Sequence, residues 1–177
     1  MRTEARGYSL YELVITVAIA SIVVVLGVPS LGRFVASSRQ VVEINALHHA
    51  LHRARSESIM RRRYISLCST IDGEQCSGSE DWSSGWLMFE NSDRDRPARI
   101  DAGESILDRH TVSPTIVLQA NRSDFTVRGT QRRSTNGTLI ACDIADRAPP
   151  RALVVSYTGR PRAAQTDRAG EPYRCSD

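Results

Sequence analysis

A glycine and a glutamate stand at the start of a long apolar run near the beginning of the chain. Glu12 follows Gly7 by five residues and lies at the edge of the uncharged segment. A carboxylate within a helix in lipid costs about 2.5–3.5 kcal/mol, so it usually marks a functional partner. Cleavage after Gly7 would create one, because the new α-amino group of Tyr8 would be positively charged. The spacing therefore predicts that this amine on one subunit pairs with Glu12 on the next.

A second candidate site is the segment Gly159-Arg160-Pro161-Arg162 near the other end of the chain. Two arginines separated by one residue after a strand would project two guanidinium groups from a turn. Gly159 permits an unusual backbone angle there, and Pro161 stiffens the loop. Guanidinium groups bind phosphate oxygens in a bidentate way that does not depend on base sequence.

Basic residues are concentrated toward the C-terminus. All 23 are arginine, and the formal net charge is +3. Residues 64–119 carry 4 Arg and 10 Asp or Glu, whereas residues 120–177 carry 10 Arg and 6 Asp or Glu, so the net charge changes from −6 to +4. Further arginines extend a basic patch if the fold gathers them, and are ordinary solvated surface if it does not. They are Arg128, Arg132, Arg133, Arg151, Arg168 and Arg174.

The four cysteines all follow the apolar run. Three pairings are open to them. Locality favours Cys68–Cys76, which leaves Cys142–Cys175. The spacings of 7, 65 and 32 intervening residues fit no common zinc pattern. Disulfides indicate an oxidising compartment, which in a bacterium is the periplasm or the cell exterior.

Three histidines close together in the sequence raise the question of a metal site. His48 and His52 are four residues apart, as in helical metal pairs, and His49 lies between them. No carboxylate or cysteine accompanies them at ligand spacing, so we expect a helix surface or a contact between subunits. The sequence also lacks a nucleophile elbow, a phosphate-binding glycine loop and a metalloprotease motif. We expect no metal, no cofactor and no enzyme activity.

The apolar run that follows Glu12 must position the N-terminal site, which extends from Gly7 to Glu12. Leu13 to Leu31 is 19 residues without a charge, or about 28 Å of helix, close to the ~30 Å hydrocarbon core of a bilayer. A secretory signal cut after Ala20, an ordinary signal anchor and a leader cut after Gly7 compete as explanations. Cutting after Ala20 would leave an apolar mature N-terminus, and a simple anchor leaves Glu12 without a partner.

The helix is expected to continue past the membrane, over about residues 8–63, with residues 13–31 in the bilayer. Pro29 should bend it rather than end it. Beyond the proline, apolar residues recur with helical spacing, which predicts an amphipathic second half lying on a sheet. They are Val41, Ile44, Leu47, Leu51 and Ala54.

Residues 64–177 have the pattern of a β-domain. Alternating apolar residues separated by turn residues predict seven strands. Their ranges are 64–69, 85–90, 105–107, 115–119, 124–128, 138–142 and 152–157. The expected fold class is therefore α+β: a long N-terminal helix, membrane-spanning in its first half and amphipathic in its second, packed on one antiparallel β-domain.

The N-terminal motif, G-[aromatic]-[ST]-L-x-E-L, resembles the class III leader of type IV pilins and type II secretion pseudopilins. The resemblance implies that prepilin peptidase removes residues 1–7 by cutting after Gly7 and N-methylates Tyr8, where the family usually carries Phe or Met. Glu12 would aid assembly into a filament with other major and minor pilins. The subunit would sit in the bacterial inner membrane with its globular domain in the periplasm, and reach the pilus or cell surface after assembly.

The order of features in the rest of the chain resembles the GspH/FimT family of minor pilins and pseudopilins. A strand with Cys68 leads through a short loop to Cys76, then to the sequence W-x-x-G-W at residues 82–86, an apolar strand and an Asp-rich turn. The resemblance covers nearly the full chain and is strongest at residues 7–31, 64–90 and 140–162.

Gly159, Arg160 and Arg162 match a G-R-x-R motif of FimT-type minor pilins implicated in DNA uptake. The resemblance implies a minor type IV pilin that contributes to pilus assembly and binds DNA through this loop during natural transformation. Two alternatives stay open. One is a minor pilin that primes assembly without binding DNA, and the other is a minor pseudopilin of a type II secretion system.

Overall fold

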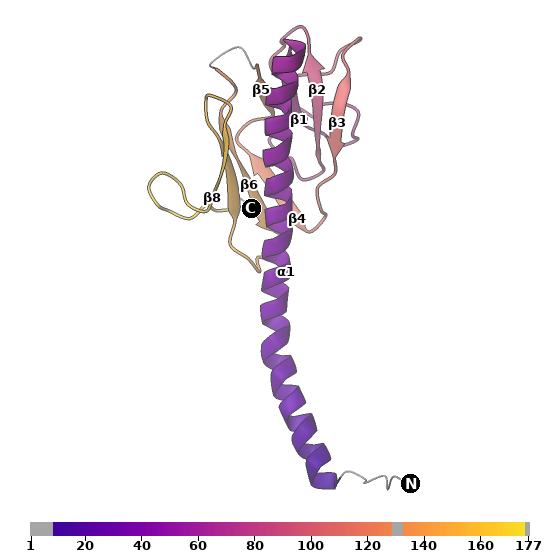
Figure 1. Ribbon diagram of the computed structural model, residues 1–177, viewed down its shortest axis with the longest axis vertical. Coiled ribbons are helices and arrows are strands. Elements are labelled where there is room, and N and C mark those ends of the chain that lie inside the picture. Colours follow the sequence, from indigo (N-terminus) through magenta and orange to yellow (C-terminus); the bar gives the residue numbers. More distant parts are fainter. Residues whose placement is uncertain (1–8, 129–132, 176–177) are drawn as a thin grey trace, which may run out of the picture.

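A single long helix runs the length of the molecule and carries a globular domain on its second half (Figure 1). The structure is a computed structural model that describes residues 9–128 and 133–175. The elements in chain order are α1 (Leu10–Arg61), β1 (Tyr64–Ser69), β2 (Trp86–Asn91), β3 (Ile106–His110), β4 (Ile116–Ala120), β5 (Asp124–Val127), β6 (Gly137–Asp143), β7 (Arg151–Val155) and β8 (Pro161–Ala164).

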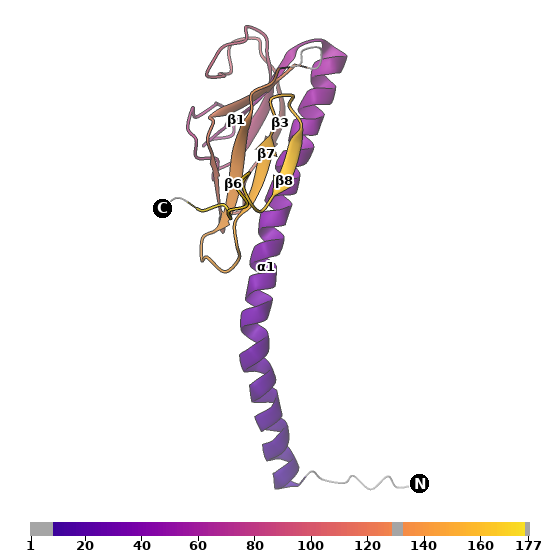
Figure 2. The same ribbon diagram turned by 90° about the vertical axis from the view of Figure 1, so that its left-hand side faces the viewer.

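Local sequence determines where α1 begins and ends. The Ser9 hydroxyl accepts a hydrogen bond from the Glu12 N–H at 3.2 Å, and the Glu12 carboxylate accepts one from the Ser9 N–H at 3.1 Å. This reciprocal pair is a capping box, which satisfies two backbone donors at a helix start. Arg62 adopts a left-handed conformation that ends the helix. Pro29 lies inside α1 without interrupting it, and Figures 1 and 2 show a gentle curve over the lower half.

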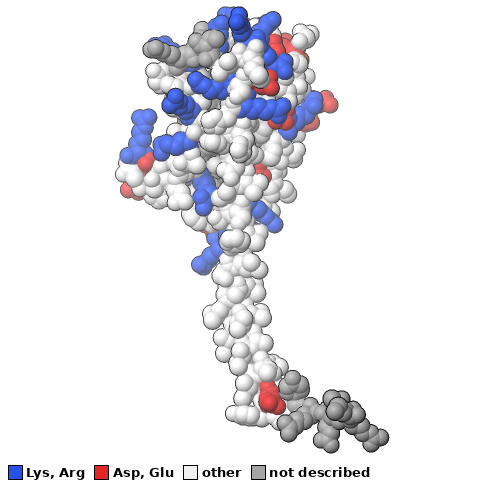
Figure 3. Space-filling model, viewed as in Figure 1, with Lys and Arg blue, Asp and Glu red and all other residues white. Residues whose placement is uncertain are grey.

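The two halves of α1 have different surroundings. No residue from Leu10 to Val35 is buried, and the charged residues in this half are Glu12 and Arg33. Figure 3 shows most of the stalk below the globular domain as uncharged surface, with an acidic group near its lower end. By length and composition, α1 can cross a membrane. From Ala36 onward, buried residues recur every three or four positions and face the sheets. They are Ala36, Gln40, Glu43, Ile44, Leu47, Ala50, Leu51, Ala54 and Ser58.

Two four-stranded antiparallel sheets form the globular domain. Their strand orders are β3-β2-β1-β5 and β4-β6-β7-β8. The packed half of α1 contacts strands of both sheets, and the core lies between them, with Leu47 and Leu51 of α1 against Phe125 of β5 and Leu153 of β7. Figure 2 shows the helix lying along one side of the domain. The predicted fold class is confirmed.

All seven predicted strands are present, with small shifts at their ends, but β8 was not predicted. Its sequence begins with Pro161 and has no apolar alternation. As an edge strand, β8 pairs only with β7, and proline is tolerated at the first residue of such a strand. The expectation that both arginines of the motif project from a turn was therefore wrong, because Arg162 lies within β8.

The cysteines form Cys68–Cys76 and Cys142–Cys175 disulfides, with Cα–Cα distances of 5.6 and 6.1 Å. This is the pairing that locality favours in the sequence. The first disulfide closes the loop that follows β1, and the second ties the C-terminal segment to β6.

A buried carboxylate joins α1 to the connection between β3 and β4. Glu43 is only 5% exposed. It accepts hydrogen bonds from His110 Nε2 at 2.8 Å and from the Ser113 N–H at 3.0 Å, while the His110 ring stacks on Trp86. Burial acts to raise the pKa of Glu43, but the hydrogen bonds from His110 and Ser113, together with the charge interaction with His110, outweigh it and hold the pKa below its ordinary value.

Glu43→Gln should lower the free energy of unfolding at neutral pH by about 1–3 kcal/mol, because the amide cannot accept both hydrogen bonds. Since the folded pKa of Glu43 lies below its unfolded value, the contribution is present above the unfolded pKa. It is lost as the pH falls through the folded pKa. Urea unfolding in detergent at several pH values measures both effects. Glu74→Gln, at an exposed position, is the control, and an equal loss in that variant would contradict the assignment.

Candidate functional site

The Gly159–Arg162 motif forms the second half of the hairpin between β7 and β8. The Gly159 N–H donates to the Ser156 carbonyl at 2.8 Å, and the Ser156 N–H donates to the Arg160 carbonyl at 3.0 Å. In the strands, Arg162 pairs with Val154. Arg160 immediately precedes β8 and Arg162 lies within it, and both line the same groove. Both are exposed.

Two features of position 159 favour glycine: its backbone angle and the close approach of Ser134. Its φ is +73°, and a Cβ placed there would lie 2.7 Å from the Ser134 hydroxyl oxygen. The neighbouring residues hold the loop in place, since the Ser134 N–H donates to the Tyr157 carbonyl at 2.8 Å. The Arg55 side chain of α1 donates to the Thr158 carbonyl at 2.6 Å. The loop is therefore positioned by both the helix and the segment before β6.

A groove of about 890 Å³ opens beside this hairpin. Arg160 and Arg162 line one part of it, and Arg168 and Tyr173, from the segment that follows β8, also line it. The Asp167 carboxylate, also in the lining, accepts hydrogen bonds from two backbone N–H groups of its own loop. Arginine side chains are spread over this side of the globular domain in Figure 3, where the segment after β8 projects to the left.

The C-terminal segment that completes the groove is held at both ends. Thr166 pairs with Pro172 across the base of its loop, and the Tyr173 N–H donates to the Gln165 carbonyl. The Cys142–Cys175 disulfide then fastens the chain to β6. The structure thus brings three predicted arginines, 160, 162 and 168, to one groove, although seven residues lie between the first and the last.

A second groove of about 490 Å³ adjoins the first. Its lining includes Arg96, Arg122 and Arg133. Asn136 and Tyr157 line both grooves. Of these three arginines, only Arg133 was predicted for the basic patch.

The N-terminal site is described only in part. Gly7 and Tyr8 lie outside the described residues. Glu12 is exposed at the third position of α1. The hydrogen bonds from Ser9 both reach Glu12 Oε2, so the carboxylate caps its own helix.

A family model described as "Type II transport protein GspH" matches residues 43–159. The chain belongs to the GspH family. The matched region runs from the packed half of α1 to Gly159, and so covers about two thirds of the chain.

Two solved structures share the fold of this GspH-family chain. The type IV minor pilin FimU of Pseudomonas aeruginosa PAO1 matches with a TM-score of 0.50 and 22% identity over 75% of this chain and 90% of FimU. The minor pseudopilin EpsH of the Vibrio cholerae type 2 secretion system matches with a TM-score of 0.51 and 10% identity over 71% of this chain and 96% of EpsH. No curated protein sequence gave a significant match. The protein is therefore a member of the GspH family whose α1 is long and apolar enough to cross a membrane.

The fold does not gather every predicted arginine. The Arg128 guanidinium lies 4.7 Å from the centre of the Tyr64 ring and donates to the Tyr64 hydroxyl at 2.9 Å. Arg151 donates to the Ser37 hydroxyl on α1 at 3.3 Å. Both arginines therefore make internal contacts. Arg174 is exposed but lines neither groove, and Arg132 lies outside the described residues.

Sequence reasoning missed two arginines and two tyrosines that line the grooves: Arg96, Arg122, Tyr157 and Tyr173. Tyr157 could have been found from the sequence, because it is an aromatic residue two positions before Gly159 of the motif. The other three carry no such signal, because they reach the site from distant segments.

The three histidines lie close together on α1. The His48 ring centroid is 4.6 Å from that of His52 and 5.9 Å from that of His49. Partial burial lowers the pKa of His48, and the neighbouring histidines lower it further. Their role as helix surface or subunit contact stays a prediction.

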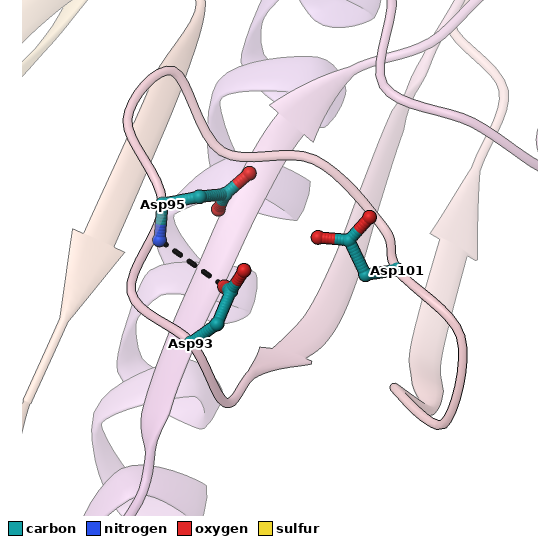
Figure 4. A group of neighbouring side chains, drawn as sticks. All are labelled: Asp93, Asp95 and Asp101. Atoms are coloured by element: carbon teal, nitrogen blue, oxygen red, sulfur yellow. Dashed lines mark hydrogen bonds between the residues drawn. The ribbon is translucent and has the colours of Figure 1, made fainter.

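Three carboxylates that the sequence analysis did not single out form a cluster after β2 (Figure 4). Oxygens of Asp93, Asp95 and Asp101 lie within 4.8 Å of one another. Burial and the charge of Asp93 raise the pKa of Asp95. Hydrogen bonds shape this loop, since Asp93 accepts from the Asp95 N–H and Asp95 accepts from the Asn91 amide. Acidic groups near a surface often cluster without an ion, and the cluster alone does not define a metal site.

Gly159→Ala should destabilise the protein more than Gly73→Ala. A Cβ in the left-handed region costs about 1–2 kcal/mol, and Gly73 has nearly the same φ, +76°, with open space around it. At Gly159 the contact with Ser134 adds to that cost. Urea unfolding of both variants separates the two effects. Equal losses would show that the approach to Ser134 is unimportant.

Proposed function

We propose that this GspH-family protein is a minor type IV pilin that binds DNA through the groove beside the β7–β8 hairpin during natural transformation. The observation that carries the proposal is that Arg160, Arg162 and Arg168 line one groove. The lining of the groove holds three guanidinium groups and one carboxylate, that of Asp167, which already accepts hydrogen bonds from two backbone N–H groups. Such an arrangement suits phosphate oxygens and carries no base specificity.

The groove is preorganised for this role. The hairpin loop is fixed by backbone hydrogen bonds and by Arg55, and the opposite segment is fixed by a disulfide. Binding therefore costs little ordering of the backbone, and the side chains provide the charge. Binding by one subunit should be weak and strongly dependent on salt concentration.

We further propose that prepilin peptidase cuts after Gly7 and methylates Tyr8, and that Glu12 then pairs with the Tyr8 amine of a neighbouring pilin in the inner membrane. The backbone N–H and the hydroxyl of Ser9 both donate hydrogen bonds to Glu12 Oε2. Among the described residues no hydrogen bond uses Oε1, so this oxygen is free for the neighbouring amine.

A second candidate function is a minor pseudopilin of a type II secretion system that binds no DNA. The description of the matching family model, a type II transport protein, favours it. Deleting the gene distinguishes the two, because loss of DNA uptake with normal protein secretion supports the first candidate and the reverse supports the second. A pilin that only primes assembly would lose DNA uptake on deletion but would bind no DNA when purified.

Arg160→Gln with Arg162→Gln should weaken DNA binding by the full-length protein in detergent at least ten-fold at low salt. It should also reduce the slope of log affinity against log salt by about 2, because two phosphate contacts are lost. Fluorescence anisotropy with labelled DNA measures both. Arg53→Gln with Arg63→Gln changes the net charge equally, but these residues pair with Asp108 and Glu90 on the other sheet. If both double variants bind alike, the assignment of the groove is wrong.

Glu12→Ala should reduce incorporation of the subunit into filaments while leaving cleavage after Gly7 largely intact. Ser9→Ala is the matched control, because it removes one bond of the capping box but keeps the carboxylate. Immunoblots of sheared filaments and membranes report incorporation and cleavage separately. An equal defect in both variants would assign the effect to helix capping instead of to an ion pair between subunits.

A further inference from the structure

The Tyr157 ring stands where two arginine-lined grooves meet. Tyr157 contributes to the lining of both the groove beside the β7–β8 hairpin and the groove beside Arg122. It is 58% exposed. The two grooves together hold six arginines and two aspartates. The arginines are Arg96, Arg122, Arg133, Arg160, Arg162 and Arg168.

The six arginines are divided between the two grooves that Tyr157 lines. Arg96, Arg122 and Arg133 are in one groove, and the hairpin arginines and Arg168 are in the other. The two aspartates, Asp124 and Asp167, are each engaged by hydrogen bonds from their own segments. A polyanion that follows both grooves therefore meets positive charge before and after it passes Tyr157.

The Tyr157 side chain is not needed to hold its loop. The loop is closed by backbone hydrogen bonds of Ser156 and Gly159 and by a hydrogen bond between the Ser156 and Thr158 hydroxyls. Within residues 9–128 and 133–175, only the carbonyl of Tyr157 takes part in a hydrogen bond, by accepting from the Ser134 N–H. The ring is therefore available to a ligand, and Tyr173 supplies a second aromatic ring in the hairpin groove.

We propose that the two grooves form one path for single-stranded DNA, in which Tyr157 stacks on a base and the arginines on either side bind the flanking phosphates. The inference rests on the proposed DNA-binding function and specifies its substrate. In a duplex the faces of the bases are covered by their neighbours, so only a single strand offers a base face to the ring. Alternating aromatic and cationic contacts are the usual basis of sequence-tolerant binding to single strands.

The test compares Tyr157→Ala with Tyr157→Phe, which keeps the ring, in the full-length protein in detergent micelles. The probes are a labelled single-stranded 20-mer, the duplex of the same sequence and an abasic strand with the same number of phosphates. Tyr157→Ala should weaken binding to the single strand by roughly five-fold to one hundred-fold. Tyr157→Phe should bind as the wild type does. The duplex and the abasic strand should change less than two-fold.

The outcomes separate this inference from the proposed function. If the single strand and the duplex bind equally well and Tyr157→Ala alters neither, the stacking path is wrong while DNA binding stands. If the wild-type protein binds none of the three probes, the proposed function fails and the inference fails with it. A loss in Tyr157→Ala that Tyr157→Phe shares would also contradict stacking, since the ring is still present. Circular dichroism of each variant verifies that the fold is unchanged.

Discussion

The whole molecule depends on one continuous helix that must be stable in two different surroundings. An unbroken helix satisfies its own backbone hydrogen bonds, which is the condition for crossing lipid. The first half of α1 therefore exposes apolar side chains without a structural penalty when it lies in a membrane or among other subunits. The second half buries a stripe that includes Ile44, Leu47 and Leu51 against two sheets. Because Pro29 bends α1 without ending it, the membrane anchor and the core of the domain are a single element.

The groove depends on that helix in turn. Arg55 of α1 holds the loop between β7 and β8 through the Thr158 carbonyl, and the core beneath β7 positions the hairpin through Leu153 and Val155. The opposite wall is a segment with little regular structure, which a disulfide fastens to β6. A small domain thereby builds a rigid charged groove at the edge of a sheet, with its stability supplied by the helix and a covalent bond.

The sequence predicted the arginines of the hairpin but not their setting. Arg160 and Arg162 stand out because a glycine, a proline and their spacing form a recognisable local motif. Arg128 and Arg168 look equivalent in the sequence, yet the first stacks on Tyr64 and only the second reaches the groove. Arg96 lies in the acidic segment 64–119, and Arg122 lies in the basic segment 120–177 without a motif to distinguish it. Nothing local distinguishes an arginine that stacks on an internal tyrosine from one that lines a groove.

The sequence by itself determined the long helix, the predicted strands and the family resemblance, because periodicity, caps and short motifs act over a few residues. The pilin-type leader that the sequence predicts at Gly7–Glu12 stays a prediction, because the family match covers residues 43–159. Only the tertiary structure decided that Pro161–Ala164 forms β8 and that Tyr157 lies between two sets of arginines. These features arise from antiparallel pairing and from the path of the C-terminal segment, which bring together residues far apart in the chain. A local pattern carries no information about such long-range contacts.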